Sequence, residues 1–150
     1  MLGLYGMWSC TFFGHRYADN KLKPHIDRII EELITQKGVK LFYVGTHGEF
    51  DRMVWKVLKE KEKQHPIEVL LVLCYMPSPK TYFPTGTKTV LPDGIEKVYP
   101  KNAIIYRNKW MIDHSDYVVT YVEYDSAGAG RFKKLAEKKN KTVINISKEE

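Results

Sequence analysis

Tyr117-Val-Val-Thr-Tyr-Val122, followed closely by Tyr124-Asp-Ser-Ala-Gly-Ala-Gly130, is the stretch that decides the fold of this chain. An apolar run leads into a loop of small residues, and a helical pattern then runs over residues 132–139. Between a buried strand and a helix, such a loop lets backbone N–H groups approach an anion closely. The stretch therefore predicts a strand-turn-helix unit with an anion-binding turn.

The rest of the chain repeats this alternation of strand and helix. Strands are expected at residues 8–13, 40–44, 67–73, 117–122 and 142–146. Several of them are near-continuous apolar runs, which is typical of strands covered on both faces in a parallel sheet. Helical periodicity falls between them, at residues 24–38, from near Asp51, at about 102–114 and at 132–139.

This order predicts an α/β fold, a single Rossmann-like domain that spans residues 1–150. We expect a doubly wound, mainly parallel sheet of five strands in the order 3-2-1-4-5, with helices on both faces. The proline-rich connection over residues 75–101 falls where the chain must return across the sheet, and residues 94–99 could form a short extended piece. The further role of this connection stays open, although Tyr75, Tyr82, Phe83 and Tyr99 could either stack on a base or pack beneath the loop.

In that topology the first and fourth strands are neighbours, and ligands bind where their carboxyl ends meet. The turns expected at this edge are Gly14-His15-Arg16, the segment 45–51 and the segment 125–130. Arg16 could pair with a phosphate or be an ordinary surface arginine. His15 could donate to a ligand, act in acid–base chemistry or cap its turn.

The third helix brings further candidates to the same edge. Arg107 or Asn108 could reach the ligand, or one of them could tie the long connection to the helix. The residues expected to bind the ligand are Gly14, His15, Arg16, Gly45, Thr46, Gly48, Asp51, Arg107, Asn108, Ser126, Ala127, Gly128, Ala129 and Gly130. Should the protein be an enzyme, the catalytic acid would come from Glu49, Asp51, Glu123 or Asp125, although Asp51 could instead cap its helix.

Composition and charge narrow the classes of protein to which this chain could belong. The net charge is +6, with 43% hydrophobic and 28% charged residues, as in ordinary globular domains. No apolar run approaches the roughly 20 residues of a membrane span, and the N-terminus lacks a signal-peptide pattern, so a cytoplasmic location is expected. Cys10 and Cys74 lie in apolar runs and are expected to be buried thiols, with neither a metal site nor a cofactor.

Three segments carry a further signal: Cys10-Thr-Phe-Phe-Gly-His-Arg16, Arg107-Asn-Lys-Trp-Met-Ile-Asp-His-Ser-Asp116, and Ser126-Ala-Gly-Ala-Gly130 with the following helix and Lys141-Thr-Val-Ile-Asn145. Together they resemble the SLOG superfamily, and its YpsA-like branch most of all. The superfamily also holds the LOG phosphoribohydrolases and the Rossmann domain of DprA. The resemblance implies a pocket for a nucleotide or a nucleotide derivative such as an ADP-ribose-like molecule. The LOG loop carries a glutamate that assists N-glycosidic cleavage, and no glutamate stands at the matching position here.

Three functions follow from these features. The first is binding, for sensing or sequestering, of a nucleotide-derived small molecule. The second is an enzyme that cleaves or transfers at the N-glycosidic bond of a nucleotide, which benefits from a nearby carboxylate. The third is single-stranded nucleic-acid binding, suggested by the net charge and the DprA relation. A homo-oligomer is an open expectation, and a membrane partner is not expected.

Overall fold

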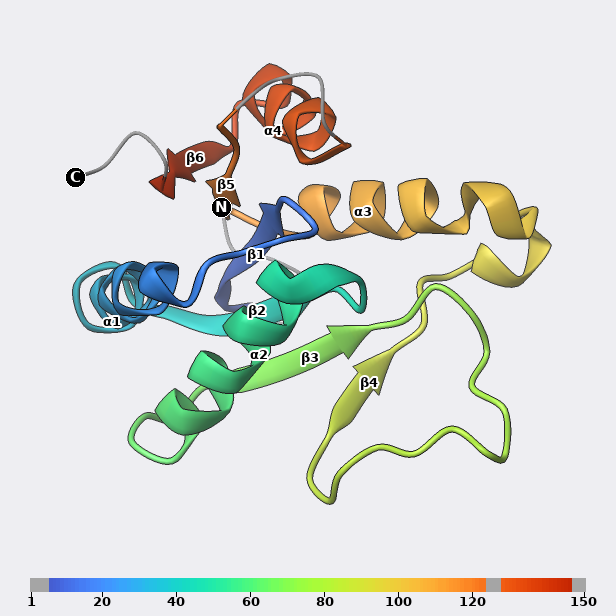
Figure 1. Cartoon of the computed structure of the whole chain (residues 1–150), viewed down its shortest axis with the longest axis horizontal. Helices are drawn as coiled ribbons and strands as arrows, with labels where there is room; N and C mark the ends of the chain where they lie inside the picture. Colours follow the sequence, from blue (N-terminus) through green and yellow to red (C-terminus); the bar gives the residue numbers. More distant parts are fainter. Residues whose placement is uncertain (1–5, 124–127, 147–150) are drawn as a thin grey trace.

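One parallel sheet organises the residues that the computed structural model describes, 6–123 and 128–146. Within these residues the sheet has six strands in the order β4-β3-β2-β1-β5-β6 (Figure 1). Every neighbouring pair in it is parallel. The strands are β1 (Trp8–Gly14), β2 (Val39–Val44), β3 (Glu68–Val72), β4 (Lys88–Val90), β5 (Tyr117–Tyr121) and β6 (Thr142–Asn145). The predicted order 3-2-1-4-5 is therefore confirmed for β3, β2, β1, β5 and β6.

The expectation of five strands is wrong by one, because β4 forms inside the proline-rich connection. This strand lies outside β3 at one edge of the sheet (Figure 1). Lys88 and Thr89 are exposed and Val90 is only half-buried, so β4 has no apolar run by which the sequence could reveal it. The extended piece expected at residues 94–99 is also wrong, because Ile95–Lys97 forms a 3₁₀ turn after Gly94, whose φ is +82°.

Four helices cover the two faces of the sheet within the described residues. They are α1 (Lys23–Lys37), α2 (Gly48–Glu62), α3 (Ala103–Asp113) and α4 (Gly128–Lys138). The helices α1 and α2 pack on one face, and α3 and α4 pack on the other. Of these helices, none has the length and apolar character that a membrane crossing needs.

The two-sided covering explains the continuous apolar runs in the strands. In β2, Phe42 and Val44 belong to the core beneath α1 and α2, whereas Leu41 and Tyr43 belong to the core beneath α3. Successive side chains of a strand point to opposite faces, so both sets of residues must be apolar. The same rule places Phe12 and Phe13 of β1 in different cores.

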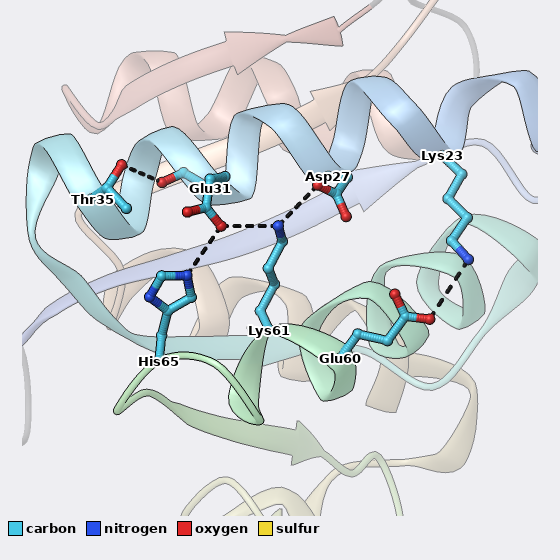
Figure 2. Close-up of polar contacts among 7 residues, drawn as sticks. All are labelled: Lys23, Asp27, Glu31, Thr35, Glu60, Lys61 and His65. Carbon is cyan, nitrogen blue, oxygen red and sulfur yellow. Dashed lines mark hydrogen bonds and ion pairs between the residues drawn. The ribbon is translucent and has the colours of Figure 1, made fainter.

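A cluster of charges fixes α1 against α2, as Figure 2 shows. The Lys61 ammonium lies 2.9 Å from a carboxylate oxygen of Asp27 and 2.9 Å from one of Glu31. His65 also reaches Glu31, at 3.1 Å. Burial works against a charged Lys61, but the hydrogen bonds that its ammonium donates to both carboxylates raise its pKa. The hydrogen bond from Lys61 in turn lowers the pKa of Glu31.

We predict that Lys61→Met lowers the free energy of unfolding by about 1–2 kcal/mol at pH 7, because two carboxylates lose a nearly buried partner. The folded pKa of Glu31 lies below its unfolded value, so this contribution is present near neutrality and is lost as the pH falls through the folded pKa. The gap between the variant and the native chain should therefore narrow below about pH 4. Urea unfolding at several pH values measures this difference in the free energy of unfolding. Lys56→Met, which removes an exposed lysine of the same helix, is the control and should change stability little.

Candidate functional site

A cavity of about 660 Å³ lies at the carboxyl ends of β1 and β5. The chain leaves β1 toward β2 on one side and returns through β5 on the other, so this edge is the switch point of the sheet. The candidate residues that line the cavity are Gly14, His15, Arg16, Gly48, Asp51, Arg107, Asn108, Glu123, Gly128 and Ala129. Residues of the loops after β1 and β2 and of the start of α4, far apart in the sequence, therefore meet around one hollow.

Packing requires a glycine at position 14. A Cβ built on this residue would lie within 2.7 Å of Phe50 Cδ1, too close for any side chain. Phe50 is buried, and its ring stacks on that of Tyr121 with the centroids 6.1 Å apart. The absence of a side chain at Gly14 therefore lets the first turn of α2 approach the end of β1.

The loop after β1 is also fixed to the first turn of α2 by hydrogen bonds. The Glu49 N–H donates to the Arg16 carbonyl at 2.7 Å, and the Ala18 N–H donates to Glu49 Oε2 at 3.1 Å. Gly48 has a φ of +93°, and a Cβ there would lie 3.2 Å from Arg16 Cα. The carboxylate of Glu49, a candidate catalytic acid, therefore holds the loop that carries Arg16.

The Arg16 side chain is exposed and lines the cavity. Among residues 6–123 and 128–146, no carboxylate pairs with its guanidinium. A cation of this kind, held by its backbone and open at the side chain, can bind an oxyanion in bidentate fashion.

His15 joins the two central loops. Its Nε2 accepts a hydrogen bond from the Glu123 N–H at 2.9 Å, and its ring lies edge-on to Tyr121. The Tyr121 hydroxyl donates to a carboxylate oxygen of Glu123. Of the roles weighed for His15, capping the turn is the one that this geometry matches, and Glu123 takes part in the same contact.

Arg107 performs a structural task that the sequence did not reveal. Its side chain is 1% exposed. The guanidinium donates to the Val72 carbonyl at 2.9 Å, to Thr46 Oγ1 at 3.0 Å and to Asn108 Oδ1 at 2.7 Å. It therefore ties α3 to the end of β3 and to the turn after β2, and not to the long connection.

Asp51 also lines the cavity, with its carboxylate near the Arg107 guanidinium. Burial raises the pKa of its carboxyl to about 6, although the Arg107 charge and the His47 N–H both oppose the rise. The His47 N–H donates to Asp51 Oδ2 at 3.2 Å. The helix begins at Gly48, not near Asp51 as expected, with His47 as its N-cap residue. Asp51, which lies within the first turns of α2, therefore accepts a hydrogen bond from a backbone N–H at the N-terminal end of the helix.

His47 and Tyr17 are among the lining residues that the sequence did not single out as candidates. Desolvation, together with the charges of Arg107 and Arg16, lowers the pKa of the His47 ring. The ring is therefore neutral at pH 7, and its Nδ1 lies 3.4 Å from Arg107 Nη2, an obligate donor. Tyr17, directly after Arg16, is 74% exposed and also lines the cavity. An exposed aromatic beside a cation was the signal that could have identified it.

The remaining candidate residues line other cavities, are buried, or lie outside the residues that the structure describes. Gly45 and Thr46 line a second, smaller cavity on the other side of Asp51, and Glu49 lines a third. Gly130 is buried inside α4. Asp125, Ser126 and Ala127 lie outside the described residues. Cys10 and Cys74 are buried thiols, as expected. Within the described ranges, no three His, Cys, Asp or Glu side chains gather as a metal ion would require.

Comparison with known proteins identifies the fold. No family model and no curated protein matches the chain. A solved structure of DNA processing protein A from Helicobacter pylori, described for its single-stranded DNA binding mode, is similar with a TM-score of 0.62 and 18% sequence identity. The similarity covers 91% of this chain and 63% of that one, so the chain spans less than two thirds of that protein. It agrees with the expected relation to DprA, and at this identity it shows a shared Rossmann-like fold alone.

We predict that Gly14→Ala lowers the free energy of unfolding by at least about 2 kcal/mol, because the new methyl group would displace the Phe50 ring. Gly128→Ala is the matched control, since a Cβ there meets no atom within 4 Å. It should change stability by less than about 0.5 kcal/mol or raise it slightly. Denaturant unfolding of both variants measures the difference, and equal effects would contradict a packing role for Gly14.

Proposed function

We propose that the switch-point cavity binds a nucleotide or a nucleotide-derived ligand, such as an ADP-ribose-like molecule, as a sensor or a sequestering protein. The observation that carries the proposal is the Arg16 guanidinium, which lines the cavity without a carboxylate partner among the described residues. The start of α4 supports it, because Gly128 and Ala129 line the same cavity and helix N-termini favour anions. The volume, about 660 Å³, is in the range of small-molecule sites.

In this proposal the residues divide into two groups. Arg16 and the start of α4 receive the phosphate, and His47 and Asn108 supply hydrogen bonds nearby. Gly14, His15 and Arg107 hold the turns in place through the contacts described above. Membership of the SLOG superfamily, and of its YpsA-like branch, belongs to the same proposal.

N-glycosidic cleavage has less support. The carboxylate of Glu49 holds the Ala18 N–H, and that of Glu123 accepts from the Tyr121 hydroxyl. Asp51 satisfies the first turn of its helix. Each candidate acid in the described residues thus already has a structural contact, and the chain lacks the LOG glutamate.

We predict that AMP and ADP-ribose bind the native chain, and that Arg16→Ala weakens both by about 10- to 100-fold, because a charge-assisted hydrogen bond to phosphate is lost. Titration calorimetry at low and moderate salt measures the affinities. Arg28→Ala is the matched control, since it removes an arginine from the exposed side of α1, outside the cavity. Absence of saturable binding at millimolar ligand, or equal affinity in native and Arg16→Ala protein, would overturn the proposal.

Single-stranded nucleic acid is the second candidate, and the similarity to DNA processing protein A is the observation that favours it. The exposed ring of Tyr17 beside Arg16 offers a surface on which a base could stack. The net charge of +6 would favour the binding of a polyanion such as single-stranded nucleic acid.

This candidate predicts that a thymidine oligonucleotide binds with an affinity that falls steeply with salt, as phosphate contacts release counterions. Tyr17→Ala should weaken that binding by about 5- to 10-fold, through loss of stacking. Fluorescence anisotropy with a labelled oligonucleotide measures both effects. No binding at low salt would remove the candidate and leave the small-molecule proposal untouched.

A further inference from the structure

The second cavity of the fold lies directly beside the proposed phosphate site. It has a volume of about 280 Å³ and lies between α2, the end of β3 and the proline-rich connection. Its apolar walls come from Trp55, Leu71, Phe83 and Pro84. None of the functions described above uses this cavity.

Two residues border both cavities, Gly48 and Asp51. Gly48 has no side chain between them, and a Cβ built there would lie 3.2 Å from Arg16 Cα. A ligand held at Arg16 therefore has the smaller cavity as its neighbour across the first turn of α2.

The chemistry of the smaller cavity fits a flat heterocycle. Two aromatic side chains and a proline provide apolar surface for a ring. Thr46, Asp51, Arg52 and Thr87 add donors and acceptors at its border. Apolar walls with a few polar groups are the usual composition of a site for a small aromatic ligand.

We propose that this smaller cavity is the base subsite of the nucleotide site, in which Trp55 and Phe83 contact the base while Arg16 holds the phosphate. The inference rests on the proposed function and adds a specificity determinant to it. It also gives the proline-rich connection a role, because Phe83 and Pro84 belong to that connection. Of the four aromatic residues that the sequence offered for stacking, only Phe83 lines this cavity, whereas Tyr82 is 81% exposed and does not.

The test compares AMP with ribose 5-phosphate, which has the same phosphate and sugar but no base. The native chain should bind AMP about 10-fold more tightly or better, since stacking on aromatic side chains favours the base. Phe83→Ala should lower the AMP affinity about 10-fold and leave that of ribose 5-phosphate unchanged. Tyr82→Ala, the adjacent exposed aromatic, is the matched control and should change neither affinity.

A spectroscopic readout on the native chain needs no variant that might fold poorly. AMP should change the tryptophan fluorescence, and ribose 5-phosphate should not, because the base alone contacts Trp55. In a Trp55→Phe variant the AMP-induced change should be lost while Trp8 and Trp110 remain.

The failures of the two proposals are distinguishable. Equal affinities for AMP and ribose 5-phosphate, both reduced by Arg16→Ala, would overturn the base subsite and leave the phosphate site standing. The base subsite is overturned in the same way if Phe83→Ala leaves AMP binding unchanged. If neither compound binds, or Arg16→Ala has no effect, the proposed function itself falls and the base subsite falls with it.

Discussion

The buried guanidinium of Arg107 is the interaction on which the ligand-facing edge of this fold depends. A charge can be buried only if hydrogen bonds replace the water that it loses. Arg107 finds these partners on β3, at Val72, and on the turn after β2, at Thr46, while it stands on α3 itself. Because α3 packs on the opposite face of the sheet from α2, this one side chain joins α3 to the turn that leads into α2. The same arrangement explains the glycine at the start of that turn, since a Cβ on Gly45 would lie 2.7 Å from Asp51 Oδ2 and 3.3 Å from the Arg107 guanidinium. Arg107 is consequently committed to the fold, and of the two arginines of the cavity Arg16 is the one whose charge remains available to a ligand.

Sequence patterns predicted the sheet well because each pattern reports a local physical requirement. Continuous apolar runs such as residues 41–44 require covering on both faces, and this requirement indicated the parallel strands. Their order was indicated by the position of the long connection, where the chain must return across the sheet. The edge strand β4 was missed because an exposed strand of three residues places almost no demand on side chains. Gly38 ends α1 at a φ of +69°, as a glycine at a helix end should.

The candidate site was harder to predict, because turn residues can serve a ligand or the fold with the same sequence. Gly14 was expected to give room to an anion, and it gives room to Phe50. Arg107 was expected either to reach the ligand or to tie the long connection to its helix; it lines the cavity, and its hydrogen-bond partners on other elements lie on β3 and on the turn after β2. No local pattern encodes such partners, since Val72 and Thr46 are 35 and 61 residues away in the chain.

The two candidate ligands both require a phosphate site, and they differ in the place that the base requires. A free nucleotide and a single strand of DNA both present a phosphate and a base, so Arg16 and an adjacent apolar surface suit either. They differ in where the base must go. A polymer needs an exposed platform such as Tyr17, along which further nucleotides can continue, whereas a mononucleotide can bury its base. The position of Phe83 and Trp55 beside Asp51 suits the second arrangement, because a cavity of about 280 Å³ with apolar walls has room for one base.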